Sequence, residues 1–172
     1  MAKLRKMLGD VNGQECMDMM HLIDTQSKET LAAWALSYVK EYYTKIYTSS
    51  CLNETMNMVK CCLEKEITVK ELKPYLKTAR DDVKAINDPV DVAASRAIAT
   101  ACAILQTPSN ALGFLFYGAA VTAYHEAGIE AEQAVYEEYG RNEFCRAYRS
   151  LKQVAIENEE HPVNIKWSWD HL

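Results

Sequence analysis

Few residues in this sequence break helices. Only four prolines and six glycines occur among 172 residues, and no segment alternates β-branched and polar residues with the period of two that a half-buried strand requires. No linker, repeat or low-complexity stretch divides the chain. We therefore predict an all-α fold class, with a single domain spanning residues 1–172 in the form of a helical bundle.

The spacings that hold metals are also missing. The six cysteines form no CxxC pair, the four histidines never pair at i, i+3 or i, i+4, and no apolar signal segment precedes the cysteines. We expect reduced thiols in a cytoplasmic protein that uses no metal or cofactor. A metal site assembled from distant residues is the less favoured alternative.

An excess of basic charge is absent as well. Lys and Arg number 19 against 24 Asp and Glu, for a net charge of −5. Residues 1–125 contain fourteen acids and fourteen bases, whereas residues 126–172 contain ten acids and five bases. A nucleic-acid-binding protein usually shows the opposite sign, so we predict no nucleic-acid partner. A basic protein partner is the more natural expectation.

No apolar run is long enough to cross a membrane. The longest stretch without a charged residue or histidine extends from Ala97 to Tyr124, and the sequence QTPSN at residues 106–110 breaks it into halves shorter than the roughly 20 residues of a span. Pro108 disfavours helix at the preceding residue and suits the first turn of the next helix, with Ser109 and Asn110 as capping residues. We predict no membrane contact and a central buried antiparallel helical hairpin over residues 89–127, ended by Gly128.

Helical periodicity extends to both sides of this hairpin. The clearest apolar stripe follows Ser27, a predicted N-cap, and Thr68 with Glu71 forms a predicted capping box. We also expect a short helix at residues 2–8, a helix capped by Asn53, a kink or restart at Pro74, and a first helix of the hairpin from residue 89 to about 105. The stripe after Ser27 consists of Leu31, Trp34, Ala35, Tyr38, Val39, Tyr42 and Ile46.

The remaining expectations concern partners of single residues and the end of the chain. Arg96 lies on an otherwise uncharged surface, so we expect a carboxylate or carbonyl partner for it. The last long helix is expected to begin near Glu130 and to bend around Gly140. A non-helical tail of about residues 157–172 contains two tryptophans and is predicted to pack back on the bundle or into a partner.

Catalytic motifs are missing from the sequence, and we predict that the protein is not an enzyme. It has no nucleophile elbow, Gly-rich phosphate loop or HExxH motif. The alternative is a small-molecule-binding protein or enzyme with a polar pocket at the hairpin tip, and a third reading is an oligomerisation domain. The pocket would consist of Gln106, Thr107, Ser109, Asn110, Tyr38 and Tyr42. A capped turn and core-edge tyrosines explain the same residues more simply.

Negative charge is concentrated between residues 126 and 138, where five glutamates and no cation occur. On a helix that begins near Glu130, the step of about 100° per residue places Glu130, Glu137 and Glu138 in one stripe, with Tyr136 and Ile129 toward the core. We predict that this stripe meets a basic partner. A solvated face without a partner is the alternative.

Five segments of the sequence carry a family resemblance: DTQSKETLAAWALSYVKEYY, EKEITVKEL, DPVDVAASRAIATA, TPSNALGFLFYGAA and ENEEHPVNIKW. Together they resemble a bacterial family of immunity proteins associated with polymorphic toxin systems. This resemblance implies an all-helical cytoplasmic protein that binds and neutralises a toxin without catalysis of its own. Members often carry histidines beside the Thr-Pro turn, where this chain has Gln106 and Asn110. The sequence assigns no toxin and no oligomeric state.

Overall fold

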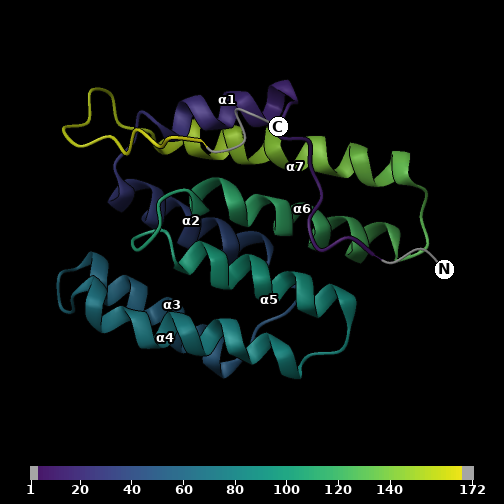
Figure 1. Cartoon of the computed structure of the whole chain (residues 1–172), viewed down its shortest axis with the longest axis horizontal. Coiled ribbons are helices and arrows are strands. Elements are labelled where there is room, and N and C mark those ends of the chain that lie inside the picture. Colours follow the sequence, from purple (N-terminus) through teal and green to yellow (C-terminus); the bar gives the residue numbers. More distant parts are fainter. Residues whose placement is uncertain (1–3, 168–172) are drawn as a thin grey trace.

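The computed structural model describes residues 4–167, and the part it describes is an assembly of helices without a strand (Figure 1). The predicted all-α fold class is confirmed. The helices are α1 (Gln14–Ile23), α2 (Lys28–Tyr42), α3 (Ser50–Leu63), α4 (Val69–Asp82), α5 (Pro89–Cys102), α6 (Asn110–Ala127) and α7 (Gln133–Val154), with a short 3-10 turn, η1 (Val83–Ala85), after α4.

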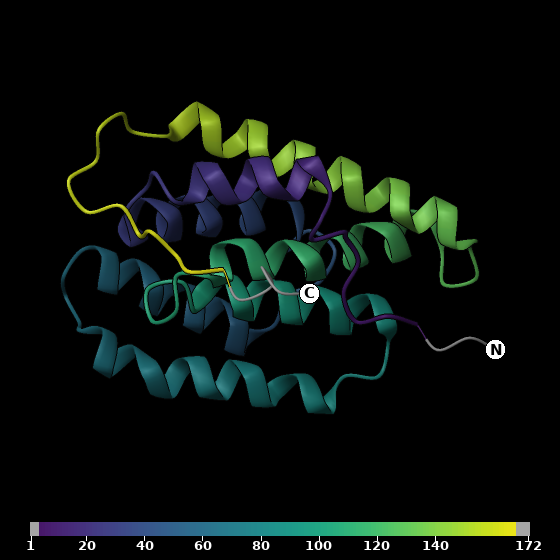
Figure 2. The same cartoon turned by 45° about the horizontal axis from the view of Figure 1, so that its top comes forward.

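The helices α5 and α6 form the centre of the bundle. Helix α7 packs on α6 and α1 lies along α7, while α3 and α4 pair on the opposite side of α5 (Figures 1 and 2). Five buried alanines of α5 let its neighbours approach closely: Ala93, Ala94, Ala97, Ala99 and Ala101. Within residues 4–167, no helix combines the length and the apolar character that crossing a membrane requires. The predicted central hairpin is therefore present and buried.

Local sequence signals predicted the start of α5 and the end of α6, but not the turn between the two helices. Asp88 caps α5 by accepting from the Val90 N–H at 2.9 Å, and Gly128 ends α6 with a φ of 81°. Helix α5 ends at Cys102, three residues earlier than expected. The predicted caps in the turn are wrong, because the Ser109 side chain makes no capping bond. The backbone itself closes the turn, with the Thr107 N–H donating to the Ala103 carbonyl at 2.9 Å.

Two further expectations, both in the N-terminal half of the chain, are wrong. Residues 4–8 are not helical, because the Leu8 N–H donates to the Phe116 carbonyl at 3.0 Å rather than within a helix; residues 2 and 3 lie outside the described part. Ser49 and not Asn53 caps α3, by accepting from the Leu52 N–H at 3.1 Å. Helix α3 therefore begins at Ser50.

Helix α4 begins with the predicted capping box, in which Thr68 and Glu71 exchange hydrogen bonds of 3.2 Å. The helix continues through Pro74 to Asp82 without a restart. Pro74 is exposed and removes only one backbone hydrogen bond, from a carbonyl that water reaches. Arg96 on α5 is half-buried, and its side chain has no hydrogen bond or ion pair within residues 4–167. The expected partner is therefore not found in the part of the chain that the structure describes.

Helix α7 differs from its prediction at both points. It begins at Gln133, after Glu132 as N-cap, so Glu130 lies in the preceding loop. It then runs without interruption past Gly140, which is buried against the backbone of Gly9. A glycine inside a helix costs about 1 kcal/mol, which packing against α6 and α1 outweighs.

The tail after α7 returns to the bundle, as predicted, and binds the corner between α1 and α2. The Trp167 indole N–H donates to the Asp24 carboxylate at 3.0 Å, and the Val163 N–H donates to the Gln26 carbonyl at 2.9 Å. The Glu159 carboxylate accepts from the Ser27 N–H and the Thr30 hydroxyl. The second tryptophan, Trp169, lies outside the described residues.

Candidate functional site

The five glutamates between residues 126 and 138 are all exposed at the end of the molecule where α6 turns into α7. We call this surface the acidic end; it consists of Glu126, Glu130, Glu132, Glu137 and Glu138. Two apolar side chains are exposed among them, Ile129 at 47% and Val135 at 39%. The acidic end therefore exposes two apolar side chains together with charges of one sign.

Tyr136 gives the acidic end its shape. Its ring is buried beside Tyr124, and its hydroxyl donates to the Gly128 carbonyl at 2.6 Å and accepts from the Ala131 N–H at 3.1 Å. These bonds hold the loop over the ring and keep Glu130 off the helix. The expectation that Tyr136 anchors this region is confirmed, whereas Ile129 does not face the core.

The glutamates of α7 consequently do not form one stripe. Glu137 accepts from the Gln133 amide at 3.5 Å and faces a cleft beside α7. Glu138 and Glu126 lie near Tyr139, whose pKa is raised by burial and by these two carboxylates. Residues 137 and 138 differ by about 100° around the helix, which explains why they face different sides.

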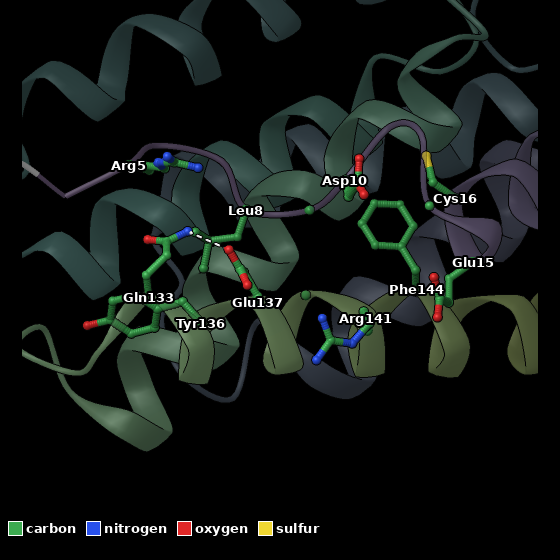
Figure 3. Close-up of a pocket in the computed structure, with 13 residues that line it drawn as sticks. Arg5, Leu8, Asp10, Glu15, Cys16, Gln133, Tyr136, Glu137, Arg141 and Phe144 are labelled. Atoms are coloured by element: carbon green, nitrogen blue, oxygen red, sulfur yellow. Dashed lines mark hydrogen bonds between the residues drawn. The ribbon is translucent and has the colours of Figure 1, made fainter.

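The cleft beside α7 has a volume of about 390 Å³ (Figure 3). One wall is the N-terminal segment, defined as residues 4–13, together with the start of α1; the other wall is the first half of α7. Two bonds fix the segment in place: the Tyr124 hydroxyl donates to the Arg5 carbonyl at 2.5 Å, and the Leu8 N–H donates to the Phe116 carbonyl. The cleft is therefore a product of long-range contacts.

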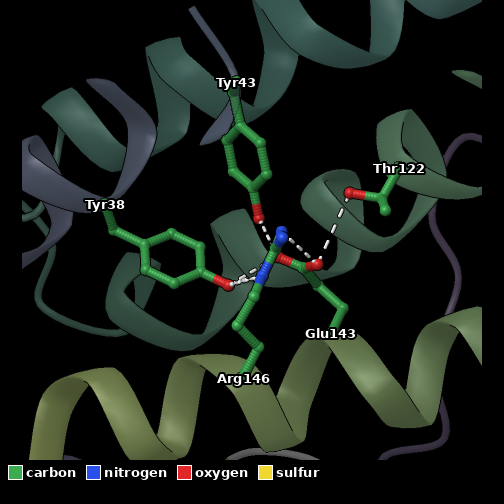
Figure 4. A network of polar contacts seen from close by, with 5 residues as sticks. All are labelled: Tyr38, Tyr43, Thr122, Glu143 and Arg146. Atoms are coloured by element: carbon green, nitrogen blue, oxygen red, sulfur yellow. Dashed lines mark hydrogen bonds and ion pairs between the residues drawn. The ribbon is translucent and has the colours of Figure 1, made fainter. Parts of the chain in front are cut away.

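A buried polar network joins α2, α6 and α7 behind this surface (Figure 4). The Glu143 carboxylate, only 2% exposed, accepts from the Tyr38 hydroxyl at 2.7 Å and the Tyr43 hydroxyl at 2.5 Å. Arg146 pairs with the same carboxylate at 2.6 Å, and Thr122 of α6 donates to it at 3.4 Å. The network ties α7 to two other helices through one side chain.

The network is electrically balanced and rigid. Burial, and then the Glu143 carboxylate, raise the pKa values of Tyr38 and Tyr43, so both hydroxyls keep their protons. Burial acts to lower the pKa of Arg146, but Glu143 and Tyr38 outweigh burial and raise this pKa above its ordinary value. The guanidinium therefore stays charged. That guanidinium lies 3.7 Å from the centre of the Tyr42 ring. Tyr38, Tyr43 and Arg146 are therefore not poised to accept or release a proton near neutral pH.

Sequence reasoning missed Glu143 and Arg146, although a signal was present. The buried stripe of α7 contains Tyr136, Gly140, Ala147 and Leu151, and Glu143 falls on that stripe. A carboxylate at a core position requires partners, and the tyrosines of the helix that follows Ser27 were the obvious candidates.

The residues of the predicted hairpin-tip pocket lie in two places. Gln106 and Thr107 are exposed at the tip, beside Ser109 and Asn110, which are half-buried. Tyr38 and Tyr42 pack on each other with ring centres 4.8 Å apart. Both lie against Arg146. No described hydrogen bond or ring contact joins the two groups, and the 390 Å³ cleft is lined by other residues.

The cysteines and acids of the described chain do not gather into a metal site. Within residues 4–167 no three His, Cys, Asp or Glu side chains are grouped closely enough to hold a metal ion. All six cysteines are free thiols, and burial raises the pKa values of Cys16 and Cys102 to about 12. Those two thiols therefore stay protonated and unreactive at neutral pH.

Comparison with known proteins identifies one family. A family model described as "Imm-5 like putative immunity protein" matches residues 21–143. The match contains α2 to α6 and the first half of α7, and it leaves out the N-terminal segment and the tail. No curated protein and no solved structure matches the chain.

Proposed function

We propose, from the premise that the chain belongs to the Imm-5 like immunity protein family, that it binds and neutralises a toxin protein by occluding the toxin surface and without catalysis of its own. The family match over residues 21–143 is the observation that carries this proposal. Neutralisation by an immunity protein requires a surface that recognises the toxin.

The acidic end is the proposed docking surface. The five exposed glutamates share residues 126–138 with the exposed apolar side chains of Ile129 and Val135, and protein interfaces combine apolar and polar side chains in the same way. Charge of one sign attracts a partner of the other sign and raises its association rate. The toxin would therefore present a basic surface, with Glu130, Glu137 and Glu138 among the residues that it meets.

Binding without catalysis agrees with the side chains available. The buried carboxylate of Glu143 already accepts bonds from four groups, and the thiols of Cys16 and Cys102 are protonated. Free cysteines also fit the reducing conditions of the cytoplasm, where an immunity protein would meet a toxin that acts inside the cell.

The test begins with a pull-down of the tagged protein from its own host, and the toxin that co-purifies is then used in a neutralisation assay. The two proteins are expressed together and separately, growth is measured, and the purified pair is examined by size-exclusion chromatography. The proposal expects growth arrest by the toxin alone, rescue by this protein and a stable complex. Rescue without a complex would contradict the binding mechanism, and a complex without rescue would contradict neutralisation.

A further inference from the structure

The cleft beside α7 contains charged groups that the folded chain leaves without ion-pair partners. Its carboxylates belong to Asp10, Glu15 and Glu137 and its guanidinium groups to Arg5 and Arg141. Within residues 4–167 the ion pairs join Lys77 and Lys84 to Asp81 and Arg146 to Glu143, and none involves the cleft. The cleft charges are therefore available to a ligand, with a net charge of −1.

These charges are separated along the cleft. Asp10 and Glu15 lie on either side of Phe144, at the end marked by Cys16, whereas Arg5 lies at the opposite end above Gln133 (Figure 3). Arg141 lies between the two ends. The Asp10 carboxylate adds to burial in raising the pKa of the Cys16 thiol to about 12, so the potential at this end is negative. A cation is favoured there.

Apolar residues also line the cleft, beside its charged groups. Leu8, Tyr136 and Phe144 are buried residues that line the cleft, and Gly9 and Gly140 line it without side chains of their own. A volume of about 390 Å³ is near the lower limit of ligand pockets, which span about 300–1,000 Å³. An apolar lining with carboxylates at one end matches a side chain that has a hydrocarbon stem and a cationic head, as lysine and arginine do.

We propose that this cleft receives one lysine or arginine side chain of the basic partner. The inference rests on the proposed function and names a recognition site for it. The cationic head lies at the end of the cleft that Asp10 and Glu15 line, and the stem extends along the cleft past Leu8. Glu137 belongs both to the cleft and to the acidic end, so the two surfaces are continuous. Arg5 at the far end disfavours a second cation, which limits the cleft to one basic side chain.

The backbone amides of the six glycines can report whether a peptide binds in the cleft. Gly9, Gly13 and Gly140 line the cleft, whereas Gly113, Gly118 and Gly128 do not. The experiment titrates the full-length, ¹⁵N-labelled protein with the capped tripeptide acetyl-glycyl-arginyl-glycinamide and follows glycine amide signals by NMR. We expect the three cleft glycines to shift and the other three to stay in place.

Matched peptides and variants separate charge from shape. The citrulline version of the peptide has the same shape without the charge, and the glutamyl version has the opposite charge; neither should shift the cleft glycines. Asp10→Asn keeps the acceptor for the Asn12 N–H, and Glu15→Gln is equally conservative. Each should bind the arginyl peptide roughly threefold more weakly. Glu126→Gln removes one negative charge outside the cleft. This variant should bind the arginyl peptide as tightly as the wild-type protein does.

Three outcomes would overturn the inference: no shift with the arginyl peptide, equal shifts at all six glycines, or a cleft that responds to the glutamyl peptide instead. The last would show that Arg5 and Arg141 make an anion site. Because no toxin is used, these outcomes leave the neutralisation assay untouched. Conversely, cleft shifts without neutralisation would refute the proposed function alone.

Discussion

The hydroxyl of Tyr43 donates to the carboxylate of Glu143 across 100 residues of sequence, at 2.5 Å and without access to water. Tyr43 follows the last turn of α2, and Glu143 lies in the middle of α7, so one hydrogen bond joins the end of α2 to α7. Four predictions follow from this bond and from the other contacts that surround α7.

Glu143→Gln should destabilise the protein by about 2–3 kcal/mol. An amide cannot accept from two tyrosines while also satisfying Arg146, because one of its two ends carries donors. Urea unfolding measures the change, with Glu137→Gln as the control, since it alters an exposed glutamate of the same helix and should stay within about 0.5 kcal/mol. Equal stability of the two variants would mean that the network contributes nothing net.

Gly118→Ala should cost about 1–3 kcal/mol, because a Cβ at this position would overlap the Tyr43 hydroxyl and push it from Glu143. Gly113 on the same helix is the control. A Cβ there would meet its nearest atoms at 3.7 and 3.8 Å, so Gly113→Ala should be neutral or stabilise by up to about 1 kcal/mol. Thermal unfolding measures the melting temperatures of the two variants. If Gly118→Ala melts at the same temperature as Gly113→Ala, the close contact between Gly118 and Tyr43 is refuted.

The tail should loosen in acid. Burial acts to raise the pKa of Glu159, but hydrogen bonds from Thr30 and Ser27 outweigh it and lower the pKa below the ordinary value of 4.5. A lowered folded-state pKa stabilises the fold above the unfolded value, and this contribution disappears as the pH falls through the folded value.

We therefore expect wild-type protein to be more stable than Glu159→Gln at pH 6 and the difference to shrink as the pH falls below the ordinary value of 4.5. Denaturant unfolding at several pH values measures it. Glu157→Gln, an exposed change two residues away, should show no such dependence. A difference between wild type and Glu159→Gln that persists unchanged at pH 3 would contradict the role of the ionised carboxylate.

Charge reversal at the acidic end should slow association with the toxin. The triple change Glu130→Lys, Glu137→Lys and Glu138→Lys leaves the fold intact, since all three side chains are exposed, and should reduce the on-rate at low salt roughly tenfold or more. Stopped-flow mixing at several ionic strengths measures the rate.

The control for this experiment is an equal change of charge elsewhere. Glu54→Lys, Glu64→Lys and Glu66→Lys alter exposed residues on and after α3, on the far side of α5. This variant should associate nearly as fast as wild type. If the on-rate is indifferent to the reversal at the acidic end and to salt, the docking surface must be sought elsewhere, with the hairpin tip as the next candidate.

Local signals in the sequence were sufficient to predict most of the helices. The caps at Ser27, Thr68 with Glu71, and Asp88, and the stop at Gly128, act within a few residues of themselves and therefore work wherever the helix packs. The apolar runs around Pro108 likewise require burial, which placed the hairpin at the centre. The acidic charge at the end of α6 is also visible as composition alone.

Tertiary structure decided how these parts form a site. The start of α7 depends on the Tyr136 hydroxyl, which holds the loop through Gly128 and Ala131 and so separates Glu130 from the helix. The cleft exists because Leu8 bonds to a backbone carbonyl more than a hundred residues away, and Glu143 is tolerated in the core only because Tyr38 and Tyr43 reach it. Periodicity describes one helix at a time, whereas these contacts join side chains distant in sequence, so their pairing is fixed only when the helices pack.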